Sequence, residues 1–288
     1  MQIINHYRTR PSSIFITLLL TGTAVIFLLP VVYIITTAFK PLSELFLYPP
    51  RFFVQNPTMQ NFSDFMQATE AAIVPFSRFL FNSVIVTVFS VGLALFISSL
   101  CAYAFSRMNF PGKNWLFGLI IISLMFAPEA VVITRFLVIS QLGIINTYFG
   151  HILPQIAVPV GVFLMKQFMD QIPSSLSEAA RIEGAGEFTI YWRIIMPNVM
   201  PAIGAVMIIV FQGVWMDTTS SVLFMTDESM RTLPYFVSTL TGIGSAATDV
   251  ARQGAAAAAG FLMFMPNFLL FAVMQKSMIE TMVTSGIK

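Results

Sequence analysis

The chain has 288 residues, of which 57% are hydrophobic and only 10% are charged, and its mean hydropathy is +0.82. Soluble domains carry about 25% charged residues, so this composition excludes an ordinary soluble fold and indicates a protein embedded in a membrane. The net charge of +2, without a run of basic residues, gives no indication of nucleic-acid binding.

Long stretches without Asp, Glu, Lys or Arg divide the chain, and a helix crosses a bilayer with about 20 apolar residues. The longest stretch, between Arg135 and Lys166, exceeds one span and is divided by the polar turn at 141–147. The sequence therefore predicts an all-α polytopic protein with a single transmembrane domain over residues 1–288. Six spans are expected, at about 14–39, 79–105, 114–137, 148–168, 197–217 and 254–275.

The first span is too long for a cleaved signal peptide, and no small-residue cleavage site follows it. If the N-terminus is inside, nine of the 15 Lys and Arg residues fall in the inner segments. Positive charge favours the cytoplasmic side. We therefore expect both termini in the cytoplasm and two long loops, 40–78 and 217–253, outside.

The residues that carry enzyme chemistry are nearly absent. Cys101, the single cysteine, can form no intrachain disulfide, and the only histidines are His6 and His151. Gly112-Lys113 is no phosphate-binding loop, because Asn114 follows it and Arg107 stands where the first glycine would be. We predict no catalytic residue and no metal ligand, so any ATP hydrolysis would need another polypeptide.

A polar segment at about 171–196 separates the fourth and fifth spans. Ser175 and Glu178 have the spacing of a capping box, which predicts the start of a short helix. Gly184 can adopt the left-handed conformation that ends a helix, and a second helical segment leads from Glu187 to Pro197. The pattern predicts a helix–turn–helix at the cytoplasmic face, although an ordinary amphipathic interfacial loop would look similar.

The spacing of Glu178-Ala179-Ala180, Gly184, Ile194 and Pro197 resembles the signature of inner-membrane components of binding-protein-dependent ABC importers. This chain has Met196 where the family usually has Leu. Further phrases in matching order, such as Asn82-Ser83, resemble the carbohydrate branch that includes the smaller maltose permease subunit.

The resemblance implies a type I importer permease in a prokaryotic cytoplasmic membrane. Glu178, Ala179, Ala180 and Gly184 would form the coupling element that docks on an ATPase subunit. The implied partners are a paralogous permease subunit, two cytoplasmic ATPase subunits, an extracytoplasmic sugar-binding protein and an oligosaccharide substrate. No cofactor would bind this chain, because ATP and Mg would bind the partner subunits.

In the family that the chain resembles, the fifth span lines the translocation path. This implies that Gln212, Trp215 and Asp217 contact the substrate, since an indole ring and an amide suit a sugar. The other interpretation is that Trp215 and Asp217 anchor the helix at the outer interface.

A glycine-rich tip lies in the second outer loop. The resemblance implies that Thr241, Gly242, Gly244 and Ser245 contact the docked binding protein, although on sequence alone the tip could be a flexible turn.

An ion-coupled secondary transporter of a polar solute is the alternative function. Such a transporter needs titratable groups in the middle of the membrane. The candidates Glu129, Arg135 and Asp217 instead fall near the outer ends of predicted spans. This distribution favours the importer.

Overall fold

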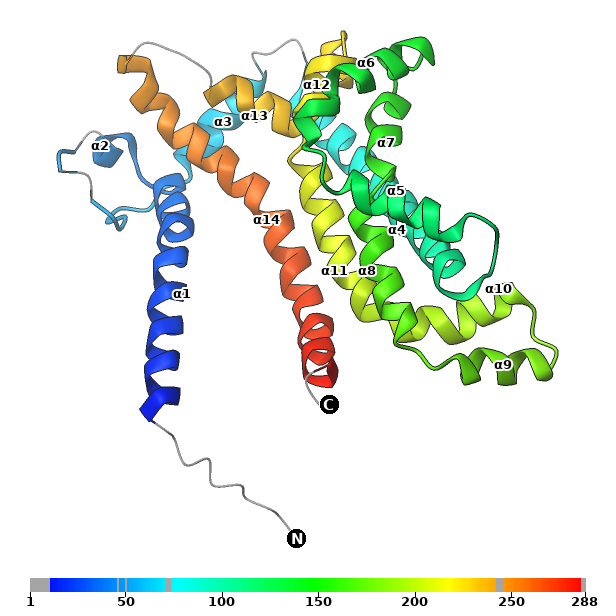
Figure 1. Ribbon diagram of the computed structural model, residues 1–288. Coiled ribbons are helices and arrows are strands. Elements are labelled where there is room, and N and C mark those ends of the chain that lie inside the picture. Colours follow the sequence, from blue (N-terminus) through cyan, green and yellow to red (C-terminus); the bar gives the residue numbers. More distant parts are fainter. Residues whose placement is uncertain (1–10, 46, 50, 71–73, 242–245, 286–288) are drawn as a thin grey trace. The chain divides into compact units, whose positions relative to one another are not determined.

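The computed structural model describes residues 11–45, 47–49, 51–70, 74–241 and 246–285 (Figure 1). This described part is helical and contains no β-strand. It divides into two compact units, the first comprising residues 1–68 and 240–262 and the second 69–239 and 263–288.

Among the described residues, four helical stretches are long and apolar enough to cross a membrane, and the number rises to six if each of two bent helix pairs is one span. The long helices are α1 (Pro11–Ala38), α4 (Phe76–Arg107), α11 (Met196–Trp215) and α14 (Ala246–Ser285). Helix α11 continues without a break from α10 (Glu187–Ile190) and the π-helical turn η2 (Tyr191–Ile195).

The two bent pairs replace the expected straight spans at 114–137 and 148–168. Helix α5 (Lys113–Ser123) is followed, across a bend of 107°, by η1 (Pro128–Val131) and α6 (Val132–Gln141). Helices α7 (Tyr148–Ile156) and α8 (Pro159–Asp170) meet at 42°. Pro128 and Pro159 explain both breaks, because a proline disfavours helical geometry in the residue before it.

The second unit is a bundle in which α4, α7, α8 and α11 pack together. Small residues allow close approach: a Cβ added to Gly161 of α8 would lie 3.0 Å from Ser98 Oγ of α4. In Figure 1, α10 and α9 (Ser174–Ile182) lie at one end of this bundle. Helices α6 and α12 (Thr219–Phe224) lie at the other end. The remaining elements are η3 (Glu228–Met230) and α13 (Leu233–Thr241).

The first unit contains α1, α2 (Leu42–Leu45), α3 (Gln60–Glu70) and the beginning of α14. Buried polar groups order the loop after α1, since Asn61 Nδ2 donates to the carbonyls of Ala38 at 2.9 Å and Lys40 at 2.7 Å. Glu44 accepts from the Gln55 and Asn56 amides, and chiefly the Gln55 bond holds the pKa of Glu44 below its usual value.

Candidate functional site

Helices α9 and α10 form the helix–turn–helix that the sequence predicts. Gly184 has φ of +85°, so the predicted left-handed conformation is confirmed. Its N–H donates to Arg181 O at 3.0 Å, and the N–H of Ala185 donates to Ala180 O at 2.9 Å. This pair of bonds is a Schellman motif, which satisfies the last carbonyls of α9 and turns the chain sharply.

The predicted capping box at the start of α9 is wrong. The helix begins at Ser174, immediately after Pro173, and no side chain caps its N-terminus. Pro173 has φ of −56° and ψ of 133°, and the helix that follows it begins two residues before Leu176, where the capping box would place the first helical residue. Glu178 is therefore free of a capping role, and its side chain is exposed.

The predicted coupling residues divide between two faces of α9. Glu178 and Ala179 are exposed, and Ile182 near the end of the helix is 88% exposed. Ala180 is only 9% exposed and belongs to the hydrophobic core of the bundle. Ala179 and Glu178 can thus meet a partner, whereas Ala180 packs inside this chain.

Glu187 attaches the α9–α10 segment to the helical bundle through an ion pair and a hydrogen bond. Its Oε1 accepts from Arg181 Nε of α9 at 2.9 Å, and its Oε2 accepts from Tyr103 OH of α4 at 2.6 Å. Tyr103 also packs edge-to-face on Tyr191, whose hydroxyl lies 2.7 Å from Ser99 Oγ. One carboxylate therefore joins α9, α10 and α4.

A second attachment fixes the chain just before α9. Arg107 of α4 donates from one guanidinium nitrogen to Met169 O at 2.5 Å and Ile172 O at 2.6 Å. Asp170 accepts from Ser106 Oγ at 2.7 Å and from Lys166 Nζ at 2.6 Å. The sequence places the charges of Arg107, Lys166 and Asp170 at or near the ends of two apolar runs, but it does not predict these contacts.

The predicted pathway residues have different surroundings. Gln212 is exposed, whereas Trp215 is 5% exposed and donates from Nε1 to Met263 O of α14 at 3.0 Å. Both carboxylate oxygens of Asp217 accept from the first turn of α12, at 3.1 Å from Thr219 N and 3.3 Å from Ser220 N. The contacts of Trp215 and Asp217 are thus within the chain, and substrate contact by any of the three residues stays a prediction.

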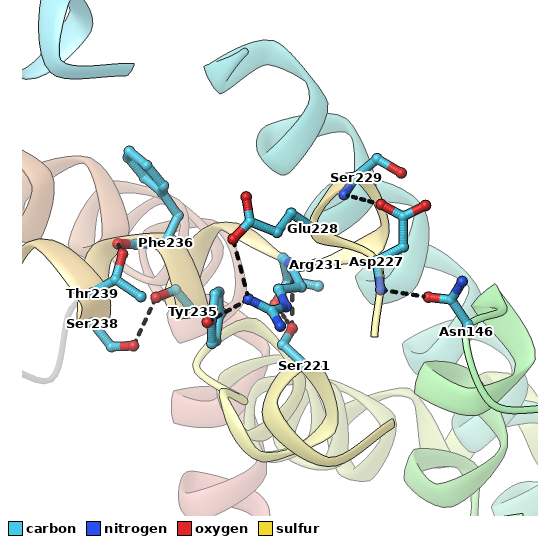
Figure 2. Close-up of polar contacts among 11 residues, drawn as sticks. Asn146, Ser221, Asp227, Glu228, Ser229, Arg231, Tyr235, Phe236, Ser238 and Thr239 are labelled. Atoms are coloured by element: carbon cyan, nitrogen blue, oxygen red, sulfur yellow. Dashed lines mark hydrogen bonds and ion pairs between the residues drawn. The ribbon is translucent and has the colours of Figure 1, made fainter. Parts of the chain in front are cut away.

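Residues 225–232, here called the outer loop, lie at the end of the bundle opposite α9 (Figure 1) and are held there by polar contacts. Figure 2 shows Asn146 accepting from the Asp227 N–H, at 3.0 Å, and Arg231 beside Glu228 and Tyr235. The Arg231 guanidinium lies 4.4 Å from the centre of the Tyr235 ring. The Ser229 N–H bond lowers the pKa of Asp227, which keeps this carboxylate charged.

Side chains of α4 also donate hydrogen bonds to backbone carbonyls of the outer loop. Asn82 Nδ2 donates to Ser229 O and Arg231 O, both at 2.8 Å, and Arg78 Nε donates to Ser229 O at 3.0 Å. Buried His151 adds a bond from α7, with Nε2 at 3.0 Å from Met230 O.

The predicted binding-protein contact lies mostly outside the described residues. Thr241 is the last residue of α13, and Gly242, Gly244 and Ser245 fall in the undescribed segment 242–245. Their contact with a binding protein stays a prediction.

Comparison with known proteins identifies the family. The family described as binding-protein-dependent transport system inner membrane component matches residues 94–277, which include α9 and α10. This chain belongs to that family. It is a membrane-spanning permease, and the predicted family is confirmed.

One curated relative matches over nearly its whole length. The arabinooligosaccharides transport system permease protein AraQ of Bacillus subtilis (strain 168) is 29% identical over 273 residues, which cover 95% of each chain.

Two solved structures share the fold. A chain of a bacterial ABC transporter involved in the import of the acidic polysaccharide alginate has a TM-score of 0.78 at 19% identity, covering 93% of this chain and 96% of that one. A chain of a bacterial alginate ABC transporter in complex with an alginate pentasaccharide-bound periplasmic protein has a TM-score of 0.60 at 14% identity, covering 90% and 92%. The all-α importer permease fold is therefore confirmed for this permease.

Proposed function

We propose that this permease is one half of the membrane channel of an ATP-driven importer for oligosaccharides. An extracytoplasmic binding protein delivers the sugar, a paralogous permease forms the other half, and two cytoplasmic ATPase subunits hydrolyse ATP with Mg. Support comes from the family match, from the arabinooligosaccharide relative, and from the alginate transporter whose structure includes a sugar-bound periplasmic protein.

The arrangement of α9 carries the proposal. This helix presents Glu178 and Ala179 outward, while Ala180 and the Arg181–Glu187–Tyr103 contacts fix its other side to the bundle. A small exposed residue lets a helix or groove of another subunit approach closely. The rigid attachment of α9 to the bundle would transmit a displacement of α9 to α4. These properties suit a coupling element that transmits movement of an ATPase subunit to the membrane-spanning helices.

The contacts near the two ends of α4 support a location of the α9–α10 segment and the outer loop on opposite sides of the membrane. Asn82 holds the outer loop and Tyr103 holds the α9–α10 segment. At about 1.5 Å per residue, they lie about 32 Å apart along the helix. This separation matches a hydrocarbon core of about 30 Å. In our proposal, α9 faces the cytoplasm and the outer loop faces the binding protein.

A bulky charge on the exposed face of α9 tests the proposal. Ala179→Arg should leave the bundle intact, because Ala179 is exposed, but should block docking of the ATPase. We expect oligosaccharide uptake and substrate-stimulated ATP hydrolysis to fall by about tenfold or more, which corresponds to about 1.4 kcal/mol of lost docking energy. Asn109→Arg, at an exposed position between α4 and α5, is the matched control and should transport normally.

Two outcomes would contradict the proposal. Normal uptake by Ala179→Arg in a complex with its ATPase would exclude α9 as the coupling element. Uptake that persists with a hydrolysis-deficient ATPase, yet stops when the ion gradient is dissipated, would support the ion-coupled alternative.

A further inference from the structure

A groove of about 420 Å³ lies between α6 and α7, away from the α9–α10 segment. Its walls are Val138 and Leu142 on one side and Leu153 and Pro154 on the other. Ile139 at its base is 4% exposed and packs with Phe224 and Met225, so a fixed core supports the groove. The volume is within the range of about 300–1,000 Å³ that small-molecule sites have.

Among the described residues, Arg135 is the one cationic side chain that lines this groove. It is half-buried, and no hydrogen bond or ion pair joins it to any residue that the structure describes. Arg107 and Arg231, by contrast, both have partners within the chain. A cation beside an apolar membrane-protein surface is costly without a counter-charge. Because no described residue of this chain neutralises Arg135, a bound anion would be stabilising at this position.

The surroundings of α6 place this cation near a lipid surface. The helix turns away from α5 by 107° instead of continuing the span, and it exposes Ile133 to 76% and Leu137 to 53%. An amphipathic helix with apolar residues on its exposed face lies at the boundary between headgroups and acyl chains. The groove thus offers a cation and an apolar channel side by side.

We propose that this groove binds one anionic phospholipid, with the headgroup phosphate on Arg135 and an acyl chain between Val138 on one wall and Leu153 on the other. The guanidinium can bind two phosphate oxygens at once, and the Thr134 hydroxyl beside it can donate to a third. Charge complementarity selects this ligand over a polypeptide, because one lipid supplies both the anion and the long apolar chain. The proposal requires only a membrane-embedded permease and is independent of the transported solute.

Lipid retention in the assembled transporter tests the site. The complex is reconstituted in nanodiscs of phosphatidylcholine containing phosphatidylglycerol, and native mass spectrometry counts the phosphatidylglycerol retained after release. Arg135→Gln should lower retention by about tenfold, because it removes the charge-assisted hydrogen bonds to the phosphate. Arg51→Gln, which removes an exposed charge in the loop after α1, should not.

Two further variants separate binding from folding. Arg135→Lys keeps the charge and should restore most of the retention, whereas Leu153→Trp fills the groove and should lower retention with Arg135 intact. Unchanged retention in both Arg135→Gln and Leu153→Trp would overturn the proposal. So would efficient crosslinking of Thr134→Cys to the second permease, because the groove would then be a subunit interface.

Discussion

At the scale of single residues, Trp215 has a position that composition could not indicate. Its ring stacks on Phe211 with centroids 5.8 Å apart, and its indole N–H is bonded to Met263 O. A buried indole normally needs such an acceptor. Trp215 therefore packs α11 against α14, and the contacts favour the structural interpretation of this residue.

Replacing Trp215 should reduce stability more than transport. Trp215→Phe loses one buried hydrogen bond, about 1 kcal/mol, and Trp215→Ala should cost about 3–5 kcal/mol through the cavity it leaves. We expect lower thermal unfolding temperatures with unchanged sugar-stimulated ATP turnover per assembled complex. Trp115→Phe, at a side chain that is 68% exposed, is the control and should alter neither measurement. Lost turnover at an unchanged unfolding temperature in Trp215→Phe would instead place Trp215 in the translocation path.

At the scale of elements, the turn between α9 and α10 depends on two glycines with different requirements. A Cβ would meet nothing within 4 Å at either Gly184 or Gly186, so space does not distinguish them. Gly184 has φ of +85°, whereas Gly186 has φ of −72°, which every residue adopts. The requirement for glycine at position 184 is therefore conformational.

Gly184→Ala should strain this turn by about 1–2 kcal/mol, while Gly186→Ala should be neutral. Hydrogen exchange of the Ala185 amide, which closes the Schellman motif, should accelerate only in Gly184→Ala. Coupling of ATP hydrolysis to uptake should weaken in the same variant. Equal behaviour of the two variants would show that the left-handed turn has no part in coupling.

The predictability of these elements follows from the range of the interactions that form them. Uncharged runs predicted the long helices, and Gly184 predicted the turn between α9 and α10, because both signals are local in the sequence. The bends at Pro128 and Pro159 were missed, since hydropathy measures affinity for lipid and not helix direction. The Glu187–Tyr103 bond joins residues 84 positions apart, and the burial of Ala180 depends on neighbouring helices, so neither has a local pattern.

At the scale of the whole molecule, the predicted orientation can be tested with the single native cysteine removed. In a Cys101→Ala background, Asn109→Cys should be protected from a membrane-impermeant maleimide in intact cells, and Thr226→Cys should be labelled. Both positions are exposed, and they flank opposite ends of the bundle. Inside-out vesicles should reverse the result. Labelling of Asn109→Cys alone in intact cells would contradict the predicted cytoplasmic termini.

The π-helical turn at Tyr191–Ile195 has a consequence for comparing permease chains. Such a turn inserts one residue into an otherwise continuous α-helix, and each residue rotates an α-helix by about 100°. The side of α10 that carries Glu187 and the side of α11 that buries Val199 therefore follow two different helical wheels. A homologue without this residue would align across the span with a single gap. The faces of α10 and α11 would stay the same in such a homologue, because the wider turn takes up the extra residue. A helical wheel drawn through this segment without the gap would therefore place the α10 side chains about 100° away from their true directions.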